Sequence, residues 1–101
     1  MKYKVVIRPE AEIDLKETFS WYEDKREGLG HDFLLQIDAG FKQLERNPFI
    51  YQQEYKEARK LLIRRFPYKI IYVVEKESIF ILAVIHGKRS SDLIINRVDN
   101  I

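Results

Sequence analysis

Cysteine is absent from this 101-residue chain, which excludes disulfide bonds and thiolate metal sites. Long apolar runs are absent as well, since no segment approaches the length that spans a bilayer. After the basic N-terminus, only Val5, Val6 and Ile7 form an apolar run, which is too short for the core of a signal peptide. The lack of cysteine fits a reducing compartment, so we expect a cytoplasmic protein that does not associate with a membrane.

Glycine and proline are scarce, with 4 and 3 residues, whereas 46% of the chain is hydrophobic. The aromatic residues are six Tyr, six Phe and one Trp. This apolar content excludes an intrinsically disordered chain, because disordered chains lack the apolar surface that offsets chain entropy. The length suits one core and no second one, so we expect residues 1–101 to form a single domain.

Two amphipathic helices are predicted in the first half of the chain. Pro9 suits a first helical turn, and acidic residues such as Asp14 place negative charge near the positive end of the helix dipole. Residues 28–30 form a tight turn, and Asn47-Pro48 closes a second helix because the residue before proline avoids helical geometry. Spacings of three and four predict two core stripes: Ala11, Leu15, Phe19 and Tyr22, widened by Ile13 and Trp21, and then Phe33, Ile37, Phe41 and Leu44.

Strands are predicted on both sides of this hairpin. Residues 2–8 form the first, and residues 58–65 alternate between two faces after a loop over 49–56. Phe66-Pro67 marks a turn, followed by strands over 68–75 and 79–86, the latter uncharged as in a strand covered on both faces. Residues 90–101 form a short C-terminal helix or tail. The fold class is therefore α+β: an N-terminal strand, an α-helical hairpin and a three-stranded antiparallel meander.

Positive charge is local to the second half. Residues 1–50 hold 8 Lys and Arg against 10 Asp and Glu, whereas residues 51–101 hold 10 against 6. A local cluster of this kind suits phosphate or carboxylate, so we expect the cations between positions 59 and 89 to converge around one pocket. The alternative is that they are solvated charges that protect a sheet edge. Neither a metal nor another cofactor is expected, because the acidic residues lack further ligands at useful spacing.

Four motifs together resemble the RelE/ParE superfamily of bacterial toxins, and the likeness covers nearly the whole chain. They are Pro9-Glu10-Ala11-Glu12-x-Asp14-Leu15, Asn47-Pro48, Phe66-Pro67-Tyr68-Lys69-Ile70-Ile71-Tyr72 and His86-Gly87-Lys88-Arg89. The resemblance implies the toxin of a type II toxin-antitoxin pair, held inactive by a cognate antitoxin. An acidic antitoxin segment that is partly disordered when free would be attracted to the basic residues and fold on them.

The RelE-like branch of the superfamily cleaves mRNA on the ribosome. Its nuclease pattern, carried onto this chain, gives the catalytic candidates Lys60, Lys69, His86 and Arg89. The pattern also expects a basic residue where this chain has Leu62 and a tyrosine where it has Ile95. Metal-free RNA cleavage needs a base, an acid and cations around the phosphorane, and only the cations are plainly present. His86 is a candidate acid or base, or a histidine that closes its strand by local hydrogen bonding.

The ParE-like branch poisons DNA gyrase and has no known catalytic residues, and the ending His86-Gly87-Lys88-Arg89 is similar to its members. The resemblance therefore favours a gyrase inhibitor over a nuclease. A third reading is a non-toxic interaction module of the same fold, with a basic face that binds a protein partner. The residues assigned to antitoxin or target binding are Arg59, Arg64, Arg65, Lys88 and Arg89.

Overall fold

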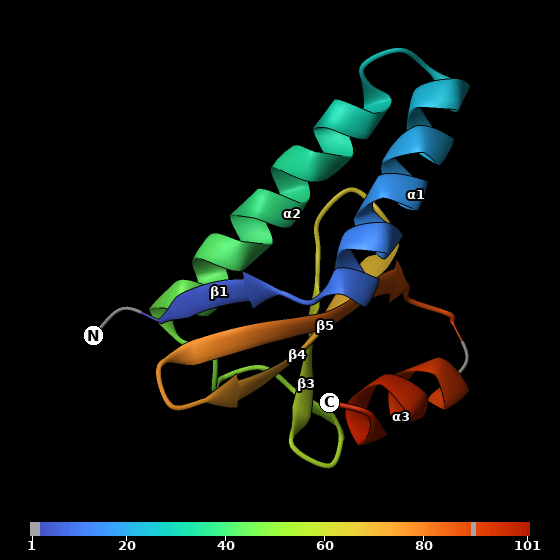
Figure 1. Cartoon of the computed structure of the whole chain (residues 1–101). Coiled ribbons are helices and arrows are strands. Elements are labelled where there is room, and N and C mark those ends of the chain that lie inside the picture. Colours follow the sequence, from blue (N-terminus) through green and yellow to red (C-terminus); the bar gives the residue numbers. More distant parts are fainter. Residues whose placement is uncertain (1–2, 90) are drawn as a thin grey trace.

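The computed structural model describes residues 3–89 and 91–101, in which a helical hairpin covers one face of a five-stranded sheet (Figure 1). The elements in chain order are β1 (Lys4–Ile7), α1 (Pro9–Lys25), α2 (Leu29–Arg46), β2 (Gln53–Tyr55), β3 (Ala58–Leu62), β4 (Tyr68–Glu75), β5 (Ser78–His86) and α3 (Ser91–Asp99). The strand order is β1-β5-β4-β3-β2, with β1 parallel to β5 and every other pair antiparallel. The predicted α+β class is confirmed.

The sheet separates two apolar clusters. Phe33 and Leu44 of α2 pack on the face that also presents Ile70 and Tyr72 of β4. The opposite face carries Ile71, and there it packs with Ile94 of α3. Alternation along β4 therefore assigns odd and even positions to different layers. Both faces of β5 are covered, as the uncharged sequence over 79–86 predicted.

The turn between α1 and α2 depends on backbone geometry and one carboxylate. Gly28 has φ +90°, a left-handed conformation that glycine adopts without a Cβ clash. Neither the Gly28 N–H nor the Gly30 N–H has a helical partner, and both donate to the Glu23 carboxylate, at 3.1 and 2.8 Å. Gly30 also lies against α1, since a Cβ there would sit 2.6 Å from the Phe19 carbonyl oxygen. Gly30 is thus required for close packing of the two helices.

Two expectations about the hairpin and the loop after it are wrong. Ile13 and Trp21 are 56% and 54% exposed and lie outside the core stripe. The indole of Trp21 instead contacts Tyr22 edge-on and lies under the Lys25 ammonium, 4.7 Å from the ring centre. The segment 49–56, predicted as a loop, contains the short edge strand β2, whose pairing with β3 is irregular.

The meander matches the prediction except at the end of β3. That strand stops at Leu62 rather than continuing to Arg65, because Arg65 adopts φ +70° in the connection to β4. The predicted strand over 2–8 is β1, with Lys2 outside the described residues, and the predicted C-terminal helix is α3, with Ser90 outside them. None of the helices within residues 3–89 and 91–101 is long and apolar enough to cross a bilayer.

A β-bulge in β5 links the three layers. Ile71 pairs with Ala83 and Tyr72 with Ile81, so Leu82 is an extra residue in β5. Beyond Ile81 the neighbouring strand β1 has ended, and side chains bind the backbone in its place. Asp14 of α1 accepts the Val84 N–H at 3.0 Å, and Arg97 of α3 donates to the Leu82 carbonyl at 2.9 Å. Asp14, interpreted from sequence as a helix-start charge, is instead part of this connection.

Candidate functional site

Lys60 and Lys69 are brought together on the face of the sheet that carries α3. The adjacent Leu61 and Ile70 point to the hairpin side, so Lys60 and Lys69 point to the other. Both ammonium groups lie 3.5 Å from the same oxygen, Oε1 of Glu54 on β2. The Lys69 side chain is only 7% exposed, whereas those of Lys60 and Glu54 are 26% and 21% exposed. Two cations therefore share one carboxylate, in surroundings that screen charge less than open water does.

Arg59 lies on the opposite face of β3 and supports a loop. Its Nη1 donates to the carbonyl oxygens of Phe49 and Tyr51, at 3.1 and 2.7 Å. The guanidinium also lies over the Phe49 ring, 5.7 Å from its centre. These contacts hold the connection between α2 and β2 on the body of the protein, and they use donors that a ligand would need.

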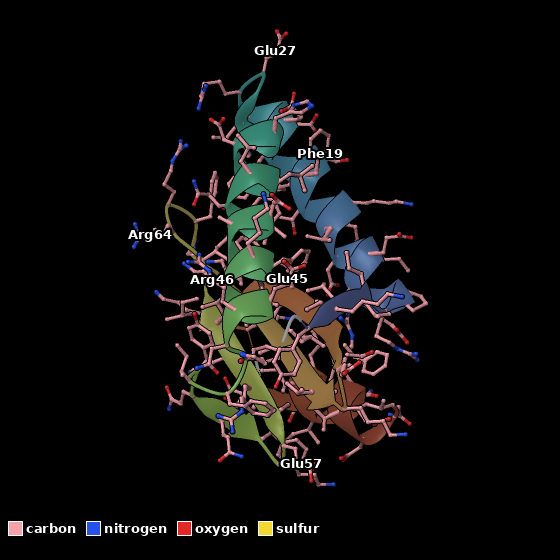
Figure 2. All side chains as sticks on the ribbon, turned by 90° about the vertical axis from the view of Figure 1, so that its left-hand side faces the viewer. Phe19, Glu27, Glu45, Arg46, Glu57 and Arg64 are labelled. Carbon is pink, nitrogen blue, oxygen red and sulfur yellow. The ribbon has the colours of Figure 1, made fainter. Side chains whose placement is uncertain are left out.

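Arg64 and Arg65 lie beyond the ends of β3 and β4. Arg65 is 3.6 Å from Oδ2 of Asp32 on α2, an oxygen that also lies 3.7 Å from Arg26. The Arg64 side chain projects away from the sheet (Figure 2). This pair thus belongs to the connection that runs beside the helices and is separate from Lys60 and Lys69.

His86, Lys88 and Arg89 lie at the C-terminal end of β5. His86 faces the hairpin side, where its ring contacts Tyr68 edge-on at 5.5 Å. Its Nδ1 accepts the Lys88 N–H at 3.1 Å, and its carbonyl accepts the Arg89 N–H at 2.9 Å. These bonds form a tight turn that presents the exposed side chains of Lys88 and Arg89.

The expected convergence of all these cations around one pocket is wrong. Alternation along the strands sends Arg59 and His86 to the hairpin face and Lys60 and Lys69 to the α3 face. Carboxylates are interspersed among them, as Glu54 and Asp32 show. The structure thus assembles one close pair of lysines and leaves the other basic residues in separate groups.

The chemistry open to the lysine pair is anion binding. The positions where the nuclease pattern expects further chemical groups carry Leu62, which is mostly exposed, and Ile95 of α3, which is half-buried. Neither hydrocarbon side chain transfers a proton. Within the described ranges 3–89 and 91–101, no group of three His, Asp or Glu side chains is arranged to hold a metal ion.

Sequence reasoning missed Glu54, the acidic member of this group. It lies in the stretch without a clear period, and nothing in its local sequence indicates a partner 15 residues further along the chain. The one available signal was that Glu54 is one of two carboxylates, with Glu57, just before a strongly basic strand. Its partner choice depends on the antiparallel register of β2, β3 and β4, which brings the three side chains together.

Comparison with known proteins shows the family to which this chain is similar. Residues 5–91 match the family described as ParE toxin of type II toxin-antitoxin system, parDE. No curated protein matches the chain at a significant level.

Solved structures show the same fold at low sequence identity. A structure of the chromosomal ParDE system of P. aeruginosa is 18% identical and has a TM-score of 0.74. The match covers 84% of this chain and 96% of the chain in that structure. A double mutant of E. coli toxin RelE in the free state is 17% identical, with a TM-score of 0.65. This match covers 100% of this chain and 99% of the RelE chain. The RelBE2 toxin-antitoxin complex of Mycobacterium tuberculosis is 18% identical, with a TM-score of 0.59 and coverage of 85% and 99%.

The family match extends from β1 to the start of α3 and so includes the lysine pair and the turn after β5. It confirms the resemblance that the four sequence motifs indicated. This chain belongs to the family of ParE toxins of type II toxin-antitoxin systems.

Proposed function

We propose that this toxin arrests bacterial growth by inhibiting DNA gyrase and that a cognate antitoxin, acidic and partly disordered when free, neutralises it. The observation that carries the choice of target is the division of the nuclease candidates between two faces of the sheet. His86 lies on the hairpin face, whereas Lys60 and Lys69 lie on the α3 face. A general acid or base must lie within hydrogen-bond reach of the reacting group, so His86 is poorly placed to act with the lysines.

The family match adds to this argument, because the matching family is that of ParE toxins. The RelE pattern would also need side chains that transfer protons at Leu62 and Ile95, and both are hydrocarbons. A protein that acts by binding gyrase needs neither group. The missing proton-transfer residues are therefore compatible with gyrase inhibition and unfavourable for RNA cleavage.

The binding residues are proposed among the exposed cations. Within the described part of the chain, the structure gives Arg64, Lys88 and Arg89 no carboxylate partner, and all three are exposed. Exposed guanidinium and ammonium groups bind acidic partners without first breaking an internal ion pair. Arg65 joins them, because its guanidinium is mostly exposed although it lies 3.6 Å from the half-buried Asp32 carboxylate. Arg59 takes part indirectly by holding the loop before β2.

A supercoiling assay tests the gyrase proposal. Purified toxin, gyrase, ATP and relaxed plasmid should give less supercoiled product and more cleaved DNA trapped with gyrase. Arg89→Ala should weaken this effect, and Lys42→Ala, which changes an exposed cation of α2, should leave it intact. Full supercoiling at a large excess of well-folded toxin would reject the proposal.

Ribosome-dependent mRNA cleavage is the second candidate, and the position of Lys60 and Lys69 beside one shared carboxylate oxygen favours it. Two adjacent ammonium groups are suited to stabilise a phosphorane. Primer extension on transcripts from induced cells tests it: breaks within translated codons, lost in Lys60→Ala, would support cleavage. Growth arrest with intact transcripts would exclude it, and unaffected growth would favour a non-toxic interaction module.

A further inference from the structure

The group of Glu54, Lys60 and Lys69 carries an unbalanced positive charge. Two ammonium groups and one carboxylate leave a net charge of +1 where Lys69 is almost fully buried. Buried charges are costly unless they are paired, and one carboxylate compensates only one of the two cations. The surplus charge favours binding of a further anion at this position.

The hydrogen bonding of the group is also incomplete. Each ammonium has three donors. Lys69 donates to Oε1 of Glu54 at 3.5 Å, the long limit for such a bond, and Lys60 lies 3.5 Å from the same oxygen as an ion pair. Strong bonds between ammonium and carboxylate are about 2.7–2.9 Å long. The lysines therefore retain donors that an oxyanion with several oxygens would satisfy better than a single shared oxygen does.

Glu54 belongs to the least regular strand of the sheet. Strand β2 has three residues, lies at the sheet edge and shifts register against β3 between Gln53 and Tyr55. Lys60 and Lys69, in contrast, extend from strands that pair in an unbroken register. The carboxylate is thus attached to the weaker part of the structure, and the two cations to the more rigid part.

We propose that Lys60 and Lys69 form an oxyanion-binding site that Glu54 occupies in the free protein as an internal competitor for a phosphate or carboxylate group. The site is independent of the choice between gyrase and ribosome as target. An incoming oxyanion displaces the Glu54 side chain and binds both ammonium groups. Without displacement, the Glu54 carboxylate repels the ligand.

Inorganic phosphate is the first probe, in an NMR titration that follows the Lys60 and Lys69 ammonium signals and the amides of β3 and β4. If Glu54 leaves the site open for about a tenth of the time, its replacement in Glu54→Gln should tighten phosphate binding about tenfold. Glu57→Gln is the matched control: it removes the same charge from an exposed residue that lies at the turn between β2 and β3 (Figure 2) and pairs with neither lysine. Lys60→Gln in the Glu54→Gln background should reverse the gain.

The outcomes separate the competitor role from general electrostatics. Equal gains in Glu54→Gln and Glu57→Gln, or no gain in either, would overturn the proposal. A repeat with acetate identifies the ligand: tighter binding of phosphate alone assigns a phosphate site, and tighter binding of both shows that carboxylate is accepted too. If Glu54→Gln does not fold, Glu54→Asp retains the charge but withdraws it by one methylene group, and a smaller gain in the same direction is expected, absent from Glu57→Asp.

Discussion

Asp14 of α1 and Arg97 of α3 form a two-point ion pair, with Nη1–Oδ2 and Nη2–Oδ1 distances of 2.6 and 3.0 Å, although 83 residues separate them. The same side chains bind the backbone of the β5 bulge, so one contact fastens α3 to both the hairpin and the sheet. The hydrogen bonds that Arg97 donates to the Asp14 carboxylate raise the pKa of the Arg97 guanidinium, which remains charged at every relevant pH. Both side chains are mostly buried, at 11% and 17% exposed.

Replacement of Asp14 by Asn should therefore be strongly destabilising. It leaves the Arg97 charge buried without a counter-charge, which typically costs about 3–5 kcal/mol. Urea denaturation followed by circular dichroism measures this free energy of unfolding. Glu12→Gln is the control, because Glu12 pairs with Lys16 on the surface at 3.9 Å and should cost less than about 1 kcal/mol. Similar losses in the two variants would contradict the role given to Asp14.

Replacement of Gly30 by Ala should separate α1 from α2. The new Cβ would meet the Phe19 carbonyl oxygen at 2.6 Å, a backbone atom that cannot move without shifting the helix. Overpacking of this kind costs about 1–3 kcal/mol, measurable as a lower midpoint of thermal unfolding. At Gly87 a Cβ would lie 3.6 Å from the nearest atom, an ordinary contact. Gly87→Ala should therefore unfold close to the wild-type temperature, and a larger loss there than at position 30 would refute the packing argument.

The turn between the helices should weaken in acid. Hydrogen bonds, first from the Gly28 N–H and then from Gly30, together with the charge of His31, hold the pKa of Glu23 below its ordinary 4.5. A lowered folded-state pKa stabilises the protein above about pH 4.5, and this contribution is lost as the pH falls through the folded value. Glu23→Gln should show a shallower fall of the melting temperature in that range. The Lys56 ammonium likewise lowers the pKa of Asp99, so the stability that Asp99 contributes is also lost as the pH falls. Asp99→Asn therefore serves as the comparison. An unchanged acid profile in Glu23→Gln would reject this assignment.

Trp21, although the sole tryptophan, should contribute little to stability. Because its side chain is 54% exposed, Trp21→Ala should change the free energy of unfolding by less than about 1 kcal/mol. Phe33→Ala should cost about 3–5 kcal/mol, because Phe33 is fully buried between the hairpin and the sheet. Chemical denaturation compares the two variants. Intrinsic fluorescence of the folded protein should already resemble that of a solvated indole, and a strongly blue-shifted emission would show that Trp21 is buried.

The order of elements could be predicted because their signals are local. Asn47-Pro48 ends α2 at Arg46, and the turn glycine Gly28 has the positive φ that the sequence suggested. Apolar spacing identified Ala11, Phe33, Ile37 and Leu44 as core residues, and all are buried. The same signal failed for Trp21, since a large apolar side chain extends a stripe in sequence whether or not an element covers it.

The geometry of the candidate site could not be predicted to the same depth because it depends on pairing between distant residues. The sequence shows the alternation within β3 but does not show which face of the sheet α3 covers. The expectation of one cationic pocket therefore includes both Arg59 and Lys60, which lie on opposite faces. The bulge at Leu82 and the contact of Asp14 with Arg97 have no local signature. Short edge strands such as β2 are equally difficult, since three residues give no period to detect.

The parallel pairing of β1 with β5 has a consequence for how the toxin is made. Strand β1 lies at the sheet edge and hydrogen-bonds to β5, which is far from it in the sequence, so β1 leaves the ribosome well before its partner (Figure 1). Until the residues up to Ile81 have emerged, the N-terminal segment has no strand to join. A growing polypeptide of this sequence therefore cannot complete the five-stranded sheet until β5 has been synthesised, so the toxin fold forms only after that point.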